Sequence, residues 1–256
     1  GASNTTIARL IIKDGDNPEN MIIFDSKGSL SKTREDIQAD ERFYRKWELC
    51  QKTNPRCIDD MEKACQGADV LIALSKPGPG VVKPEWIKAM GEKPIVFACA
   101  NPVPEIYPYE AKAAGAHIVA TGRGDFSNQV NNSLGFPGIL KGALIVRAKK
   151  VTDEMAIAAA HSIAKVAEND LTSEYIVPKM DNDRVFARVA TDVALQAIKD
   201  GVARVELSEE QIFTRADRDI RESREIIHHM MNQGYIKEPP KELIQEALSK
   251  AIDEVR

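Results

Sequence analysis

Short apolar runs alternate with stretches of helical spacing through about the first 150 residues of this chain. Each run is bounded by Gly, Pro or Asp and lacks strict alternation of apolar and polar residues, as expected of strands covered on both faces. The expected strands are Met21–Phe24, Val70–Leu74, Ile95–Ala100 and His117–Thr121. Strands joined through helices require right-handed crossovers and a parallel sheet. We therefore expect an α/β fold with a doubly wound, Rossmann-like, mostly parallel sheet.

The segments between the expected strands have the spacing of helices. They are Thr5–Lys13, Glu35–Gln51, Asp59–Gln66, Pro84–Met90 and Pro104–Ala114. From Gly138 onward the strand signals stop, and a helical C-terminal segment is expected. Its helices are Ile139–Lys149, Asp153–Glu168, Asp183–Asp200, Glu209–Asn232 and Lys241–Val255. Ser208 is expected to cap a helix, and Gly201 and Gly234 are expected to end helices.

The composition argues against several classes of function. Apolar residues make up 43% and charged residues 29%, while the formal net charge of −4 disfavours electrostatic binding of nucleic acid. The chain has no apolar run of about 18 residues, so no transmembrane helix is expected, nor is a signal peptide. The four cysteines, Cys50, Cys57, Cys65 and Cys99, are too irregularly spaced for a disulfide framework or a metal site. We expect a cytoplasmic protein with no membrane or nucleic-acid partner.

The start of the chain resembles the end of a phosphate-binding fingerprint. Gly1 is followed at once by an amphipathic helix, and the next apolar run ends at Asp25. A glycine lets the backbone approach a pyrophosphate, and the free N–H groups of a helix N-terminus bind it, while a strand-terminal acid accepts ribose hydroxyls. A buried strand normally precedes this device, so the chain is expected to be a domain of a longer protein. The alternative is that residues 1–4 are a flexible terminus.

Polar segments follow the expected strands, at the sheet edge where such folds bind ligands. They are Ser75–Gly78, Asn101–Pro102, Thr121–Asp125 and Ser127–Asn132. The last leads into a segment around Pro137, expected to open a helix with the proline in an early position. Neutral amides beside a cofactor suit a small substrate that carries a hydroxyl and carboxylates. For Asn128 and Asn131 the alternative is that they satisfy turns.

Three stretches make the resemblance to a known family specific. They read GADVLIALSKPG from Gly67, ACANPVPE from Ala98 and ATGRGDFSNQVNNSLGFPG from Ala120. Together with DSKG from Asp25 and YIVPK from Tyr175, they resemble the cofactor domain of the bacterial and archaeal type of malic enzyme. The resemblance covers the chain from its first residue to about Arg204, and no family pattern is evident beyond that point.

This resemblance implies oxidative decarboxylation of (S)-malate to pyruvate and CO2 with NAD or NADP and with Mg²⁺ or Mn²⁺. It implies that the tyrosine acid, the lysine base and the metal ligands lie upstream, in an N-terminal catalytic half of the same protein. This chain is then expected to hold no catalytic residue and no metal ligand, and to be inactive alone. The implied substrate contacts are Asn101, Asn131 and Asn132. The implied cofactor contacts are Gly1, Ala2, Ser3, Asn4, Asp25, Ser26, Lys27, Ser75 and Asn101.

The choice of cofactor depends on charges near the adenine ribose. A carboxylate at Asp25 favours NAD, because it accepts the ribose hydroxyls and repels a 2′-phosphate. Lys27, Lys32 and Arg34 could offset that repulsion, but exposed charges are largely screened. We expect NAD to be preferred and NADP to be tolerated.

Two other functions are compatible with the same motifs. The chain could belong to a malolactic relative, which returns the hydride to pyruvate, or be a non-catalytic dinucleotide-binding or assembly module. We expect residues 1–203 to form the dinucleotide-binding domain. Residues 204–256 are expected to form a helical tail for packing or subunit contact, in a homodimer or higher homo-oligomer.

Overall fold

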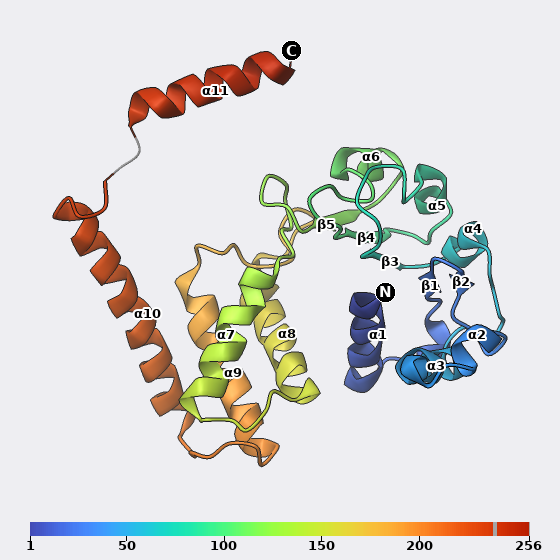
Figure 1. Ribbon diagram of the computed structural model, residues 1–256, viewed down its shortest axis with the longest axis horizontal. Coiled ribbons are helices and arrows are strands. Elements are labelled where there is room, and N and C mark those ends of the chain that lie inside the picture. The colour runs from blue at the N-terminus through green and yellow to red at the C-terminus, as the bar shows by residue number, and fades with distance from the viewer. Residues whose placement is uncertain (238–239, 256) are drawn as a thin grey trace.

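The computed structural model describes residues 1–237 and 240–255, apart from the side chains of residues 183–184 and 253–255. Its parallel sheet has three strands in the order β3-β4-β5. They are β3 (Val70–Ala73), β4 (Ile95–Ala98) and β5 (Ile118–Thr121), each within the limits of a predicted strand. The expected α/β fold with a parallel sheet and a helical C-terminal segment is thereby confirmed (Figure 1).

Short helices connect the strands and share a core with them. They are α4 (Met61–Cys65), α5 (Pro84–Lys88) and α6 (Pro108–Ala113). Val96 and Ala98 of β4 are fully buried in this core. Local caps make the helices shorter than their apolar spacing predicts. The Asp60 carboxylate accepts the Lys63 N–H at 2.8 Å before α4, and the Glu110 carboxylate accepts the Tyr107 N–H at 3.1 Å before α6.

The predicted strand Met21–Phe24 is wrong as a member of the parallel sheet. Instead β1 (Phe24–Asp25) pairs antiparallel with β2 (Gly28–Ser29) in a separate hairpin. The turn decides this, because Asp25 Oδ1 accepts the Lys27 N–H at 2.9 Å and Gly28 has a φ of 123°. The carbonyls of Met21 and Ile23 accept hydrogen bonds from Asn54 and Leu30, not from a neighbouring strand.

The predicted helix Glu35–Gln51 is interrupted. It consists of α2 (Glu35–Gln38), a single 3-10 turn η2 (Glu41–Phe43) and α3 (Tyr44–Lys52). The break falls at Asp40, whose carboxylate accepts the Arg42 N–H at 3.0 Å. An aspartate that bonds the backbone two residues ahead starts a new turn and competes with continued helix.

Helix α1 (Ala2–Asp14) packs its residue Ala8 against the hairpin and α3, in a small core with Leu30 and Leu49. Its last turn reaches α8 (Asp153–Ala167), since Lys13 Nζ lies 2.8 Å from the Glu154 carboxylate. Two more 3-10 turns occur in the loops. They are η1 (Pro18–Asn20) and η3 (Glu168–Asp170).

The second part of the molecule is a helix bundle built around α9 (Asp183–Lys199), which packs against α7 (Asn132–Ile145), α8 (Asp153–Ala167) and α10 (Glu209–Asn232). A Cβ added to Gly142 of α7 would come within 2.4 Å of the Ala190 carbonyl oxygen, and one on Gly138 within 2.6 Å of Val189. These two glycines therefore let α7 and α9 approach closely.

The start of α7 differs from the prediction. The helix begins at Asn132, not at Ile139, because Asn131 Oδ1 accepts the Ser133 N–H at 3.1 Å and caps it there. Pro137 consequently lies inside the helix and not at its opening, so the predicted early position is wrong. A proline there has no N–H to give to the Ser133 carbonyl.

The last helices have the predicted limits, α10 (Glu209–Asn232) and α11 (Lys241–Val255). Ser208 caps α10 by accepting the Gln211 N–H at 3.3 Å. Gly201 and Gly234 follow helix ends with φ values of 67° and 75°. Helix α11 stands apart from the other elements in Figure 1, and every side chain from Lys241 to Ile252 is exposed. Among the described residues, no helix is long and apolar enough to cross a membrane.

Candidate functional site

The predicted substrate asparagines meet at the carboxyl edge of the parallel sheet. Gly122 follows β5, and the Asn101 amide lies so close that a Cβ on Gly122 would be 3.3 Å from it. Asn131 Nδ2 donates to the Gly122 carbonyl at 3.1 Å. The segment before Asn131 returns alongside β5, where Val130 N–H donates to the Thr121 carbonyl at 2.8 Å. One glycine thus brings two of the three predicted asparagines together.

The three asparagines differ in how far their amides are already used. The Asn131 side-chain oxygen accepts hydrogen bonds from Ser133, and its nitrogen donates to the Gly122 carbonyl. Asn131 therefore supports the structure of the sheet edge. Asn132, the first residue of α7, and Asn101 are exposed, and neither side chain has a hydrogen-bond partner within the described chain. These two amides are therefore open to a ligand.

Asn128 has a structural role. It is buried at 5% exposure, and its Nδ2 donates to the carbonyls of Val119 and Ser173 at 3.0 and 2.8 Å. Its Oδ1 accepts the Ile176 N–H at 2.9 Å. These bonds hold the backbone of β5 to the distant segment around Ser173 and Ile176, so Asn128 is committed to the structure rather than open to a ligand.

The start of α1 lies at the same edge (Figure 1). Asn4 Nδ2 approaches the Ile72 carbonyl of β3 at 3.5 Å, while Asn4 Oδ1 is buried with no partner among the described residues. The first turn carries no acidic side chain, and Gly1, Ala2 and Ser3 are exposed. The free N–H groups and the helix dipole can therefore attract an anion at this edge.

A buried carboxylate, Glu105, holds together two loops at this edge. It was not among the predicted site residues. Glu105 is fully buried. Its Oε1 accepts the Ser75 N–H at 2.7 Å and the Ser75 hydroxyl at 3.1 Å, and its Oε2 accepts the Ala100 N–H at 3.0 Å. Glu105 therefore ties the loop after β3 to the loop after β4. Two signals could have indicated it: the glutamate ends the motif ACANPVPE, and it interrupts the otherwise apolar stretch from Val103 to Ile106.

Asp25 is held by cations at the end of β1. Lys46 Nζ lies 2.8 Å from Asp25 Oδ2, and Arg34 Nη1 lies 3.1 Å from Oδ1. Burial alone would raise the pKa of Asp25, but the hydrogen bonds from Lys46 and Arg34 outweigh it and lower the pKa to about 2. The neighbouring Ser26 and Lys27 are exposed. Lys46 comes from α3, and no sequence spacing links it to Asp25.

Among the described residues, neither a cluster of metal-ligating side chains nor a reactive cysteine thiol lies at this edge. Among the described residues, no three His, Cys, Asp or Glu side chains are placed to share a metal ion. The four cysteines are free, and burial raises the pKa of Cys99 to about 11, which keeps it a protonated thiol. What the edge offers is a helix start with free N–H groups and open neutral amides, while the carboxylate of Asp25 lies on the separate β1–β2 hairpin.

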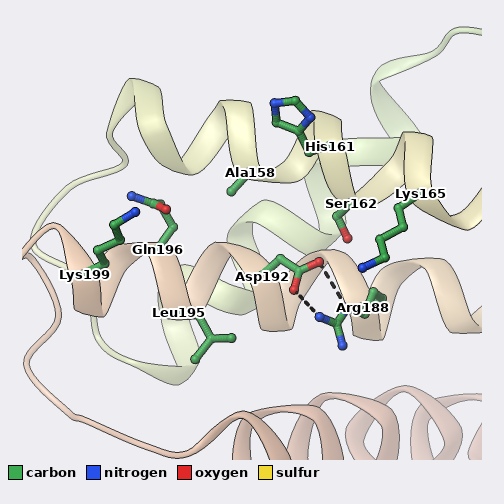
Figure 2. A pocket seen from close by; sticks show the side chains of 9 residues that line it. All are labelled: Ala158, His161, Ser162, Lys165, Arg188, Asp192, Leu195, Gln196 and Lys199. Carbon is green, nitrogen blue, oxygen red and sulfur yellow. Dashed lines mark hydrogen bonds and ion pairs between the residues drawn. The ribbon is translucent and has the colours of Figure 1, made fainter. Parts of the chain in front are cut away.

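A groove of about 330 Å³ lies elsewhere, between α8 and α9 (Figure 2). Lys165 and Lys199 flank it at opposite ends. Arg188, at the same end as Lys165, donates to Asp192 at 2.7 Å and to Glu209 at 2.8 Å, so its charge is compensated. None of the predicted site residues lines this groove, and it offers no convergent charge.

A helix N-terminus meeting the carboxyl ends of parallel strands defines the class of this protein, a dinucleotide-binding domain. Residues 5–198 match the family model described as malic enzyme, NAD binding domain. The chain therefore belongs to this family, as the sequence motifs predict. It is an NAD(P)-binding domain.

Similar proteins bear malic enzyme names. The chain is 40% identical over 214 residues to the bifunctional malic/malolactic enzyme of Bacillus subtilis, covering 83% of this chain and 50% of that protein. It is similar to the crystal structure of Entamoeba histolytica malic enzyme, with a TM-score of 0.97 and 60% identity over 100% of this chain and 53% of that one. The malic enzyme of Pyrococcus horikoshii aligns with a TM-score of 0.79 and 44% identity, over 87% and 52%. The chain thus spans about half the length of these relatives.

Proposed function

We propose that this chain is the cofactor-binding part of an enzyme that oxidatively decarboxylates (S)-malate to pyruvate and CO2. The observation that carries the proposal is that the open Asn101 amide lies against Gly122, to which Asn131, the neighbour of Asn132, also donates. The start of α1 reaches the same sheet through the contact of Asn4 with Ile72 of β3. When bound, NAD(P) accepts a hydride from the substrate, and a divalent cation held by the upstream half polarises the resulting ketone. This chain supplies the positions of both reactants.

The cofactor contacts follow from the edge. Gly1, Ala2 and Ser3 offer backbone N–H groups to the pyrophosphate, and the unpartnered Asn4 Oδ1 accepts a donor from the cofactor or from water bound to it. Ser75 and Asn101 lie on the two loops that Glu105 braces and line the nicotinamide side. Asp25, with Ser26 and Lys27, faces the adenine ribose.

The substrate contacts are neutral amides. Asn101 and Asn132 donate to the carboxylates and the hydroxyl of malate, while Asn131 fixes the start of α7. Neutral donors orient an anionic substrate without adding a full charge beside the carbon that loses the hydride. We propose no acid, base or metal ligand within this chain. Those groups belong to the N-terminal catalytic half of the same protein.

An apolar stripe on α7 supports a second half packed beside the amides. Phe136, Leu140 and Leu144 follow one another at four-residue intervals and are exposed at 60%, 42% and 72%. A continuous apolar stripe of this kind marks an interaction surface. Because α7 begins at Asn132, a catalytic half on this stripe would deliver its groups to the substrate amides.

We further propose that NAD is preferred and NADP tolerated, through Asp25. Two similar proteins carry the two cofactors in their names, an NADP-dependent malic enzyme of Halomonas elongata and an NAD-dependent malic enzyme of Geobacillus stearothermophilus.

The domain division proposed is residues 1–203 for cofactor binding and 204–256 for assembly. Four free cysteines, two of them buried, support a reducing, cytoplasmic setting.

Product analysis tests the main proposal. The complete protein, given malate, NAD(P) and Mn²⁺, is expected to release pyruvate with one reduced cofactor per turnover. Lactate without net reduction would assign it to the malolactic alternative, an activity that the name of the Bacillus subtilis relative gives beside the malic one. Binding of NAD(P) with neither product would leave a non-catalytic dinucleotide-binding module.

A further inference from the structure

The loop that follows β5 contains an arginine that the proposed site does not use. Arg123 comes directly after Gly122, the glycine against which the Asn101 amide lies. Its N–H donates to the Thr121 hydroxyl at 3.2 Å, and its side chain is 34% exposed. A cation beside a proposed substrate contact has two roles open to it. It can bind the anionic substrate, or it can fix the amide next to it.

The guanidinium of Arg123 joins two loops. Its Nε and Nη2 donate to the Asp125 carboxylate at 2.8 and 2.7 Å, within the loop after β5. Its Nη1 donates to the Pro102 carbonyl at 3.1 Å, in the loop after β4. One planar group therefore engages three of its donors at once, which gives the contact a defined orientation. Because Pro102 is the residue after Asn101, this contact restrains the backbone on the carboxyl side of Asn101.

Aromatic rings add a second connection between the same loops. The Arg123 guanidinium carbon lies 5.7 Å from the centroid of the Phe126 ring, within the range of a cation–π contact. The Phe126 ring is tilted against that of Tyr107, with 6.3 Å between their centroids. Tyr107 precedes α6, at the far end of the loop after β4. The face of the guanidinium thus lies on a ring that itself contacts the other loop.

The Asn101 amide depends on such supports. Its side chain has no hydrogen-bond partner within the described chain, so its position is set by the backbone that carries it. On the amino side of Asn101, the Ala100 N–H donates to the Glu105 carboxylate at 3.0 Å. On the carboxyl side, the Pro102 carbonyl accepts from Arg123. Glu105 restrains one flank only, and Arg123 restrains the other.

The charge of Arg123 is already compensated. The hydrogen bonds with Asp125 raise the pKa of Arg123 and lower the pKa of Asp125, so both groups stay ionised and their charges offset each other. A compensated cation favours the second role, fixing the amide. We propose that Arg123 is a positioning residue, which clamps the loop after β4 to the loop after β5 and thereby orients the Asn101 amide towards malate. This inference rests on the proposed function.

Steady-state kinetics of Arg123→Lys in the complete enzyme test this role. Lysine keeps the charge but lacks the planar fork that holds Asp125 and Pro102 together. We expect kcat to fall by about tenfold to a hundredfold with little change in the KM of malate, because misplaced groups impair the geometry of the reaction more than binding. Unchanged kcat overturns the proposal. A raised KM with unchanged kcat also overturns it, since Arg123 would then bind the substrate directly.

Arg42 provides a matched control. It makes the same two-pronged contact with an aspartate two residues away, since its Nε and Nη2 donate to the Asp40 carboxylate at 2.9 and 2.6 Å. Its guanidinium also lies 5.9 Å from the centroid of a neighbouring ring, that of Phe43. Among the described residues, however, the Arg42 side chain donates to no second loop. Arg42→Lys should therefore leave kcat unchanged.

Hydrogen exchange tests the clamp without malate or cofactor. In Arg123→Lys, the backbone amides of residues 99–106 should exchange on the order of tenfold faster than in the wild type, while those of α9 keep their rates. Equal exchange in the two proteins, or faster exchange throughout the domain, overturns the clamp. The proposed function fails separately, if the wild type does not turn over malate.

Discussion

At the scale of single residues, the site depends on which amides and carboxylates are already satisfied. Asn128 and Asn131 have committed their hydrogen bonds to the backbone, whereas Asn101 and Asn132 have not. Glu105 commits its carboxylate to three donors in two loops. Residues of one type therefore divide into supports and contacts, and substitution can distinguish them.

Replacing Asn132 by Ala in the complete enzyme should impair malate turnover much more than cofactor binding. Losing one hydrogen bond to a charged group costs about 1.5–3 kcal/mol, or roughly tenfold to over a hundredfold in rate. Steady-state kinetics and a cofactor titration measure the two effects separately. Asn169→Ala, an exposed position in η3, serves as the control. Unchanged turnover with weakened cofactor binding would reassign Asn132 to the cofactor.

Glu105→Gln should destabilise the domain and weaken cofactor binding. The substituted amide nitrogen would face an N–H group from Ser75 or Ala100, leaving a buried donor without an acceptor at a cost of about 1–3 kcal/mol. Urea denaturation reports the stability, and fluorescence titration reports the cofactor affinity. The same change at exposed Glu85 should alter neither. Wild-type values for Glu105→Gln would show that its bonds contribute nothing.

Asp25→Ser should shift preference towards NADP. The carboxylate holds Lys46 and Arg34, so its removal both ends the repulsion of a 2′-phosphate and releases cations beside it. The shift should grow at low salt, where exposed charges act over a longer range. Titrating both cofactors against wild type and variant measures it. A wild type that already prefers NADP tenfold or more would show that the cations dominate over Asp25.

At the scale of elements, helix α7 connects the site to the bundle. Its first residues present Asn132 at the sheet edge, and its middle lies against α9 through Gly138 and Gly142. The position of Asn132, a proposed substrate contact, therefore depends on helix packing several residues further along α7. Strand β4 has a comparable role, since its buried side chains fix the loop that carries Asn101.

Two glycines of α7 give opposite predictions for the same substitution. Gly142→Ala places a methyl group 2.4 Å from the Ala190 carbonyl oxygen, so α7 must move and the domain should lose about 2–3 kcal/mol. Gly135→Ala meets its nearest neighbour at 3.5 Å, an ordinary contact. It should gain about 0.5–1 kcal/mol, because alanine favours a helix. Chemical denaturation of both variants checks this, and equal effects would contradict the close packing of α7 on α9.

The sequence was sufficient for the elements that depend on local patterns. Val70–Ala73, Ile95–Ala98 and Ile118–Thr121 were predictable because continuously apolar runs are typical of strands buried on both faces. The prediction that Met21–Phe24 joins the parallel sheet was wrong, because the turn after Asp25 pairs this segment with the strand that follows it. The start of α7 was predicted too late in the chain, because Asn131 caps the helix before Pro137, which was taken to mark its opening.

For the candidate site, the rule that ligands bind at the carboxyl ends of strands predicted the meeting of Asn101 and Asn131 at one edge. It could not predict Glu105 or Lys46. Lys46 contacts Asp25 across 21 positions of the chain, and Glu105 contacts Ser75 across 30. No sequence spacing predicts either pair. Such long-range side-chain contacts become visible only in the three-dimensional structure.

At the scale of the whole molecule, the chain combines a cofactor-binding edge with two uncovered apolar surfaces. The α7 stripe lies beside the proposed substrate amides, and exposed apolar side chains of α10 and α11, such as Ile227 and Leu248, lie beyond the residues that the family model matches. The family match and the coverage of about half of each relative agree with this division. Under the proposed function, the chain supplies binding and position, and the acid, base and metal ligands come from the part that packs on it.

The chain expressed alone should therefore bind NAD(P) but show no malate-dependent reduction of it. Its described residues contain no cluster of metal ligands, and the proposed acid and base lie upstream. Absorbance of the reduced cofactor with malate and Mn²⁺ present measures turnover, and calorimetry with cofactor alone verifies that the domain is folded. Malate-dependent turnover by the isolated chain would mean that it holds acid–base groups of its own.

The shared support of two loops by one carboxylate has a thermodynamic consequence. Ser75 belongs to the proposed cofactor contacts and Asn101 to both proposed sets, and Glu105 restrains the loops of both. Ordering one loop then reduces the conformational entropy that the other has left to lose. Linkage requires the effect to be reciprocal, so malate should tighten cofactor binding by the same factor by which the cofactor tightens malate.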